Sequence, residues 1–307
     1  MPAPALPIKP ARIRRANADA GHARLPEGSL MPKVIVGREN SGDIEIYYED
    51  HGAGQPVVLI HGYPLSGRGW DKQVPALLDA GCRVITYDRR GFGRSSQPTV
   101  GYDYDTFAAD LATVLDTLDL SEVVLVGHSM GTGEVARYLG SYGSGRVAKG
   151  VLVAPIPPFL LQTDDNPGGV PHSVFDGFVR AAQSDTPAWM KGFLDTFYNI
   201  NELRGTLVSD QAYQASWNLA AAASATAAVA CIGTWTTDFR ADLAKIDVPM
   251  LVVQGDADQV LPIDKTGKRL PGLISDLQLV VIHGGPHAIP WTHAVQVNQA
   301  LLDFLRY

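Results

Sequence analysis

The chain has 307 residues, of which 46% are hydrophobic and 19% charged, with a formal net charge of −7. Its length suits one large α/β domain with room for an inserted lobe, and its acidic balance argues against nucleic acid or an anionic membrane surface as the main partner. Because Cys82 and Cys231 provide no disulfide framework and no apolar run reaches membrane-spanning length, we expect a soluble cytoplasmic protein with buried thiols.

Residues 1–32 differ in composition from the rest of the chain. The first 30 contain five prolines and four arginines and show little apolar periodicity, which predicts a flexible extension in place of a packed element. The pair Arg14 and Arg15 lacks the apolar segment that a secretory or twin-arginine signal needs. We therefore expect an upstream-start segment, with Met31 as an alternative start, or an arm across a neighbouring subunit.

From Lys33 onward, segments with strand and helix patterns alternate, as a mostly parallel sheet requires. Residues 34–36 and 44–48 predict a leading antiparallel hairpin. The other predicted strands cover an apolar run that starts at Val123 and residues 56–60, 83–87, 150–153, 250–253 and 278–282. The predicted helices cover a segment after residue 130 and residues 70–80, 106–118 and 293–305.

Residues 155–238 interrupt this alternation. They are rich in proline, glycine, aromatic residues and helix formers and contain no convincing strand. We predict a helical lid here, inserted into an α/β core made of residues 33–154 and 239–307. The predicted fold class is α/β, with a mostly parallel central sheet flanked by helices and an inserted helical lid.

A Gly-x-Ser-x-Gly motif at residues 127–131 directly follows the apolar run from Val123 and precedes a helical pattern. Strand, sharp turn and helix are the context of a nucleophile elbow, in which Ser129 takes a strained backbone conformation. Side chains at residues 127 and 131 would collide with the neighbouring strand and helix. The backbone N–H of Met130 would then favour a developing oxyanion. The alternative is an ordinary Gly-Ser turn.

A second turn follows the predicted strand 56–60, with the sequence His-Gly-Tyr-Pro-Leu at residues 61–65. A turn at this place can aim the backbone N–H of Tyr63 at the elbow and supply the second oxyanion donor that acyl transfer needs. An ordinary Gly-Pro turn is the alternative, but the pairing with the elbow favours a functional role.

A serine hydroxyl needs a base within hydrogen-bonding reach and a third group that orients the base. His287 is the predicted base because it lies in the loop between the last predicted strand and the last helix, where the order nucleophile, acid, base places it. His283, at the end of that strand, is the competitor, and His293 is assigned to the terminal helix.

The acid is expected on the loop after the preceding strand, where the sequence reads Gln-Gly-Asp-Ala-Asp at residues 254–258. We favour Asp258, which lies farther into the loop, while Asp256 is expected to hydrogen-bond the turn. Serine, aspartate and histidine in this order, each after a different strand, form a more specific pattern than any single motif.

Further stretches accompany these motifs between residues 33 and 307. Tyr-Asp-Arg-Arg-Gly-Phe-Gly-Arg-Ser stands at residues 87–95, and supporting segments lie at residues 47–52, 61–67, 101–110 and 236–240. With them, the chain resembles the α/β-hydrolase superfamily and, within it, the cofactor-free bacterial haloperoxidases, which are also called perhydrolases.

The resemblance implies catalytic roles for Ser129, Asp258 and His287, with Tyr63 and Met130 as oxyanion donors. Members of this family hydrolyse esters and also let hydrogen peroxide attack the acyl-enzyme, which releases a peracid that can oxidise bromide. The implied partners are therefore a small carboxylic acid or ester, hydrogen peroxide and bromide. The resemblance also implies a homo-oligomer that needs no cofactor.

Two further residues, Pro64 and His128, are expected at the substrate site. Pro64 follows the oxyanion residue and matches a feature associated with peroxide chemistry in the family. Tyr63 stands where an apolar aromatic residue is common, and His128 stands where phenylalanine also occurs. Both departures predict a more polar environment above Ser129.

The sequence shows no metal-ligand cluster and no dinucleotide-binding glycine motif after a strand, so no metal, haem or flavin is expected. Residues 164–166, Asp-Asp-Asn, are interpreted as a solvated turn of the lid and not as a calcium site. Arg89, Arg90 and Arg94 are expected to be held by local salt bridges and not to form an anion site.

A plain carboxylesterase or lactonase is the alternative function. Ser129 argues against the haloalkane dehalogenases and epoxide hydrolases of the superfamily, which use an aspartate at this position. A non-catalytic receptor on the same fold is a third hypothesis, because a fold does not fix a function. The complete set of triad and oxyanion residues makes it the weaker one.

Overall fold

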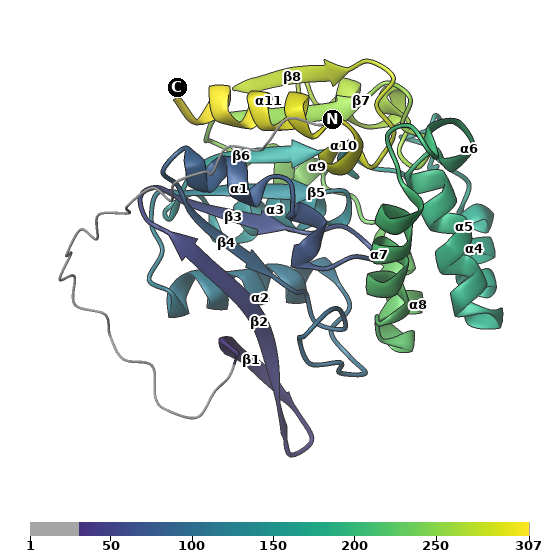
Figure 1. Ribbon diagram of the computed structural model, residues 1–307, viewed down its shortest axis with the longest axis horizontal. Helices are drawn as coiled ribbons and strands as arrows, with labels where there is room; N and C mark the ends of the chain where they lie inside the picture. Colours follow the sequence, from purple (N-terminus) through teal and green to yellow (C-terminus); the bar gives the residue numbers. More distant parts are fainter. Residues whose placement is uncertain (1–30, 307) are drawn as a thin grey trace, which may run out of the picture. The chain divides into compact units, whose positions relative to one another are not determined.

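The computed structural model describes residues 31–306, so most of the predicted extension over residues 1–32 lies outside the described residues. In the described part, eight strands form one sheet in the order β1-β2-β4-β3-β5-β6-β7-β8 (Figure 1). The strands are β1 (Lys33–Glu39), β2 (Gly42–Gly52), β3 (Pro56–Ile60), β4 (Arg83–Tyr87), β5 (Val123–His128), β6 (Val147–Val153), β7 (Met250–Gly255) and β8 (Leu277–Ile282).

The sheet is mostly parallel, as the sequence predicts. β2 pairs antiparallel with both β1 and β4, and all other neighbouring strands are parallel. The leading hairpin and the strands at residues 56–60 and 83–87 are therefore confirmed. β6, β7 and β8 are longer than predicted, because pairing with neighbours extends them beyond their most apolar residues.

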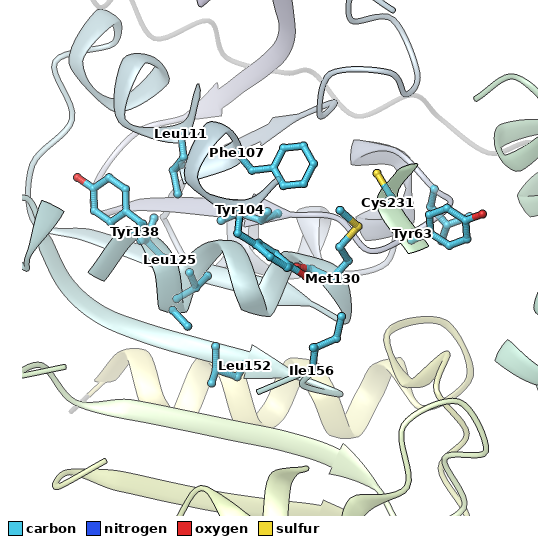
Figure 2. Close-up of a cluster of buried hydrophobic side chains, with 14 of the residues drawn as sticks. Tyr63, Tyr104, Phe107, Leu111, Leu125, Met130, Tyr138, Leu152, Ile156 and Cys231 are labelled. Atoms are coloured by element: carbon cyan, nitrogen blue, oxygen red, sulfur yellow. The ribbon is translucent and has the colours of Figure 1, made fainter. Parts of the chain in front are cut away.

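Alternate strand residues pack on opposite faces of the sheet. Leu125 of β5 belongs to one core cluster with residues of α2 (Tyr104–Thr117), α3 (Met130–Tyr142) and α9 (Arg240–Leu243), as the neighbouring side chains in Figure 2 illustrate. Val124 and Val126 belong to a second cluster with residues of α1 (Val74–Asp79) and α11 (Ala294–Arg306). Burial on both faces explains why the parallel strands are almost continuously apolar.

Residues 155–238, the predicted lid, hold five helices and no named strand within the described chain. In Figure 1, α4, α5, α7 and α8 lie together beyond the carboxyl ends of the parallel strands. Within residues 31–306, no single helix combines the length and hydropathy of a membrane span, and α7 with α8 do so only when taken together across a 94° bend. The helices are α4 (His172–Ser184), α5 (Thr186–Phe197), α6 (Ile200–Leu203), α7 (Asp210–Ala221) and α8 (Ala225–Thr234).

The predicted helix over residues 70–80 is wrong in extent. A short 3₁₀ helix, Gly67–Trp70, comes first, and α1 then begins at Val74. The Ser66 side chain caps the 3₁₀ turn by accepting a hydrogen bond from the backbone N–H of Arg68. Pro75 has no N–H to donate and therefore suits the first turn of a new helix. α10 (Ile289–Thr292) similarly precedes α11 as a separate short turn.

Candidate active site

Ser129 connects the end of β5 to the start of α3 with φ 53° and ψ −120°, a region that residues with a side chain rarely adopt. The flanking glycines are required sterically. A Cβ at Gly127 would lie 2.4 Å from the carbonyl oxygen of Gly131, and a Cβ at Gly131 would lie 2.4 Å from that of Ile60. The predicted elbow geometry is thus confirmed.

His287 bridges the serine and an aspartate. Its Nε2 lies 2.8 Å from Oγ of Ser129, and its Nδ1 lies 2.8 Å from Oδ2 of Asp258. The side chains of His287 and Asp258 are both fully buried. Because an ionised carboxylate only accepts hydrogen bonds, this arrangement puts the proton of a neutral His287 on Nδ1 and leaves Nε2 free to accept one from the serine.

The Asp258 carboxylate is itself held in place. Its Oδ1 accepts hydrogen bonds from the backbone N–H groups of Val260 and Leu261 at 2.9 and 2.8 Å, while Oδ2 faces the histidine. These two donors fix the rotation of the carboxylate. The loop after β7 therefore supplies both the acid and the groups that orient it.

The two competing residues form a separate pair at the surface. Oδ2 of Asp256 lies 2.8 Å from Nδ1 of His283, whose side chain is 90% exposed, and Oδ1 accepts a hydrogen bond from the N–H of Gly284. These hydrogen bonds, chiefly that of His283, lower the pKa of Asp256. The sequence predicts that Asp256 hydrogen-bonds its own turn, but these two partners lie in the loop after β8. His293 precedes α11 and accepts a hydrogen bond from the N–H of Val297 through its carbonyl oxygen.

The turn after β3 lies against the elbow. A Cβ at Gly62 would stand 2.9 Å from Cβ of Ser129, so only glycine permits this approach. Within residues 31–306, neither the N–H of Tyr63 nor that of Met130 has a hydrogen-bond acceptor. Buried N–H groups are rarely left without a partner, and two such donors beside a serine hydroxyl are available to a negatively charged oxygen.

A buried ion pair contacts the turn after β3. The Arg89 guanidinium lies 2.7 Å from the Glu134 carboxylate, and it also donates to the carbonyl oxygen of His61 at 3.0 Å. The N–H of Arg89 donates to Nε2 of His61, so the proton of the ring is on Nδ1, which donates to the Gly62 carbonyl. Burial, and then the charge of Arg89, hold the pKa of His61 well below its usual value.

Glu134 is a functional residue that the sequence reading missed. It lies on α3, is fully buried, and accepts hydrogen bonds from Arg89 and from the Tyr87 hydroxyl. Burial raises its pKa, while the charge of Arg89 opposes the rise. An acidic residue directly after the small residues Gly131, Thr132 and Gly133 is the signal that could have identified it. Its partner is 45 residues away in the sequence. The salt bridge is therefore not local, contrary to the expectation.

The neighbouring arginines follow the expectation in part. Arg90 forms a buried ion pair with Asp110 of α2 at 2.6 Å, and the half-exposed Arg94 lies 3.5 Å from Glu49. Salt bridges hold all three arginines, but their partners come from other elements of the fold. No two of the three guanidinium groups share a partner in the described chain.

The Tyr63 side chain binds to the inserted helices. Its hydroxyl accepts a hydrogen bond from Nε1 of Trp189 and donates one to the carbonyl oxygen of Ala228, both at 2.9 Å. In Figure 2, its ring lies beside Cys231 of α8. Because both hydrogen bonds of the hydroxyl are used, it does not make the space above Ser129 more polar, contrary to the sequence-based expectation.

His128 packs against His287 and does not line the cavity that contains Ser129. Its Nε2 donates to the carbonyl oxygen of His287 at 3.1 Å, and its ring contacts those of Trp70 and Phe197. Burial, followed by the charge of His287, lowers its pKa to about 3, so the ring is neutral. His128 lines a cavity of about 280 Å³ that does not include Ser129.

Ser129 lines a larger cavity of about 590 Å³. The residues of its wall come from the segment between β6 and α4, from α4 and α5, from Trp235 directly after α8 and from the loop after β7. Most of their side chains are apolar. Pro64 and His128, both predicted at the substrate site, are not part of this wall. The sequence could not select the lining residues, which include Phe178, Trp189 and Trp235, because their positions depend on how the helices pack.

No group of three or more His, Cys, Asp or Glu side chains is arranged to hold a metal ion in the described part of the chain. The turn at residues 164–166 is only partly solvated. Asp165 pairs with Arg240, whereas Asn166 is buried and accepts a hydrogen bond from Arg269. Both cysteines are buried, as expected.

The chain matches known proteins over nearly all of its described length. The family model of the alpha/beta hydrolase fold matches residues 55–294. A Synechocystis protein with a provisional name of non-heme chloroperoxidase is 62% identical, with 90% of this chain and 100% of the relative covered. A bifunctional esterase/perhydrolase of Acinetobacter calcoaceticus is 38% identical, with 86% and 96% covered.

The solved structures give the same picture. The crystal structure of a bromoperoxidase from Bacillus anthracis matches with a TM-score of 0.86 and 45% identity, over 90% of this chain and 100% of that one. At this level of similarity, the two chains share the same fold.

Proposed function

Because the chain belongs to the α/β-hydrolase fold family and, within it, to the non-heme haloperoxidases, we propose that it is a serine enzyme that transfers acyl groups to water or to hydrogen peroxide. The observation that carries this proposal is the buried relay from Asp258 through His287 to Ser129, with both distances at 2.8 Å. The serine at its end stands on a strained turn beside two N–H groups that have no acceptor within residues 31–306.

The first half of the reaction forms an acyl-enzyme. Nε2 of His287 takes the proton of Ser129 as Oγ attacks the carbonyl carbon of an ester or carboxylic acid. The N–H groups of Tyr63 and Met130 stabilise the negative charge on the tetrahedral intermediate. His287 then gives the proton to the leaving alcohol or water, while Asp258 stabilises the charged ring.

The second half depends on the nucleophile that enters. Water releases the carboxylic acid. Hydrogen peroxide, deprotonated by His287 in the same way, releases a peracid, so the net reaction is RCOOH + H₂O₂ → RC(O)OOH + H₂O. The peracid can pass an oxygen atom to bromide and give hypobromous acid and the carboxylate.

A cytoplasmic location and a homo-oligomer are further parts of this proposal. Light scattering of the purified protein tests the oligomeric state.

The experiment compares the wild-type protein with Ser129→Ala in two assays. One follows ester cleavage, and the other follows bromination of a dye in the presence of hydrogen peroxide, bromide and either acetate or octanoate. We expect both activities to fall by about 10³-fold or more in the variant, and bromination to require the carboxylate. Serine-dependent ester cleavage without bromination would identify a plain esterase. Tight stoichiometric binding of esters without turnover would instead support a receptor.

A further inference from the structure

The cavity at Ser129 is large and apolar. At about 590 Å³ it falls in the range of about 300–1,000 Å³ that accommodates drug-sized ligands. We propose that the acyl group taken by this site is a large apolar one, a medium-length alkyl chain or an aryl group, and not acetate. This inference rests on the proposed acyl transfer at Ser129 and specifies its substrate class.

Aromatic side chains of the inserted helices provide the wall. Phe175 and Phe178 come from α4, and Trp189 and Phe193 come from α5. The Phe178 and Trp189 rings lie 5.3 Å apart, which ties the two helices together at the cavity. Such a wall offers dispersion and hydrophobic contact to a ligand but few hydrogen bonds.

Among the described residues that line the cavity, Asp185 and Lys265 are the charged ones, and each already has a partner. The Asp185 side chain accepts a hydrogen bond from the N–H of Ala188, and Nζ of Lys265 donates to the carbonyl oxygen of Gly168. These hydrogen bonds do not neutralise the two charges, but Asp185 is exposed and Lys265 is only partly buried, and the other residues that line the cavity are uncharged. An acyl chain that is apolar along its length fits this environment best.

The cavity opens between α4 and α5. Ala181 of α4 and Ala188 and Gly192 of α5 line it and are also exposed to solvent, so they stand at its mouth. A chain attached to Ser129 can extend along the aromatic wall toward these exposed residues, whereas an acetyl group would reach only the part nearest the serine.

The first experiment measures kcat/KM for p-nitrophenyl esters from acetate to decanoate. Each CH₂ that becomes fully buried contributes about 0.8 kcal/mol, which is about fourfold in kcat/KM. We expect a rise of about threefold to fourfold per CH₂ over several additions beyond acetate. A flat series, or one that falls from acetate onward, would overturn the inference while leaving the proposed acyl transfer intact.

A binding measurement decides the case even if no ester is cleaved. The Ser129→Ala protein keeps the cavity and lacks the nucleophile, so calorimetry with octanoate and with acetate compares the two acyl groups directly. We expect octanoate to bind at least 100-fold more tightly than acetate, on the order of four buried CH₂ groups. Equal affinities would refute the inference. Absence of ester cleavage would refute only the proposed function.

Two matched substitutions locate the effect. Gly192→Phe adds a ring at the mouth, where an added Cβ meets nothing within 4 Å, so the helix itself tolerates it. Gly233→Phe adds the same ring on α8, also in open space, but outside the cavity wall. We expect the ratio of kcat/KM for octanoate to acetate esters to fall about tenfold or more in the first variant only. An unchanged ratio in both variants would contradict the proposed position of the chain.

Discussion

The hydroxyl of Tyr63 accepts a hydrogen bond from Nε1 of Trp189 at 2.9 Å, and this contact joins the turn after β3 to the wall of the acyl cavity. The same hydroxyl donates to the carbonyl oxygen of Ala228 in α8. The backbone of Tyr63 thus faces the proposed oxyanion, while its side chain binds two inserted helices. Movement of these helices would be transmitted to a catalytic N–H group.

We predict that Tyr63→Phe lowers both stability and activity. The variant leaves Nε1 of Trp189 without a partner and removes one hydrogen bond of the Ala228 carbonyl, and an unsatisfied polar group that is buried costs about 1–3 kcal/mol of unfolding free energy. A looser turn should reduce kcat by about threefold to tenfold with little change in KM, because a displaced oxyanion donor acts mainly in the transition state. Urea unfolding and steady-state ester kinetics measure the two effects.

Tyr198→Phe provides the control for this prediction. Its hydroxyl lies 2.7 Å from Oγ of Ser216 in α7, so the variant also loses a buried hydrogen bond of the inserted helices. We expect a comparable loss of stability with kcat unchanged. If both variants lowered kcat equally, the Tyr63 hydroxyl would have no special connection to the oxyanion turn.

Asp258→Asn and Asp256→Asn should differ sharply in activity. An amide in place of the Asp258 carboxylate no longer holds the proton on Nδ1 of His287, and we expect kcat for ester cleavage to fall by about 10³- to 10⁴-fold. Asp256 pairs with an exposed histidine, so its variant should keep nearly full activity. Circular dichroism verifies that both variants are folded. The opposite result would assign the acid to Asp256.

The sequence predicts the position of Asp258 beside His287 for a physical reason. Parallel strands end at the same edge of the sheet, so residues that follow Ile60, His128, Gly255 and Ile282 must meet there. The glycines at residues 127 and 131 likewise report a local steric requirement that is visible in the motif itself.

Other features depend on packing between distant segments and leave no local pattern. His128 precedes the serine in the chain, but the strand directs its ring toward Trp70 and Phe197, away from the acyl cavity. The cavity requires two inserted helices to meet at Phe178 and Trp189. The break between residues 70 and 74 shows that a helical pattern does not reveal where a cap and a proline restart the helix.

The buried neutral His128 predicts a stability that falls in acid. Its pKa is about 3 in the folded protein and about 6.5 in the unfolded chain, so between these values the unfolded chain binds the extra proton and stability rises with pH. This stability is fully present above pH 6.5 and is lost as the pH falls toward 3, by up to about 1.4 kcal/mol per pH unit.

His128→Phe removes this titrating group. We measure the unfolding free energy by urea denaturation at pH 7, 6, 5 and 4.5. As the pH falls, we expect it to decrease less steeply in the variant than in the wild type. Below pH 6 the two slopes should differ by about the contribution of one bound proton. His61, whose pKa is also lowered by burial, should keep part of the slope in the variant. Identical slopes in both proteins would mean that His128 does not titrate on unfolding in this range.

The buried pair of Arg89 and Glu134 should matter for both fold and turnover. The two side chains are 1% and 0% exposed, and Glu134→Gln would leave the guanidinium charge without a counterion, which costs about 3–5 kcal/mol of unfolding free energy. Because Arg89 also holds the carbonyl oxygen and the ring of His61, the turn that carries Tyr63 should lose its support. We expect kcat of the folded fraction to fall about tenfold, on the scale of a weakened oxyanion donor.

Asp110→Asn separates these two effects. It breaks the pair of Arg90 and Asp110, which is also buried and similarly close at 2.6 Å, but within residues 31–306 neither residue hydrogen-bonds His61. The variant should therefore lose a similar amount of stability and keep its kcat, measured below the unfolding transition and corrected for the folded fraction. If kcat fell by the same factor in both variants, the loss would not depend on the oxyanion turn, because only Arg89 reaches that turn. The pair of Arg89 and Glu134 would then serve the fold alone.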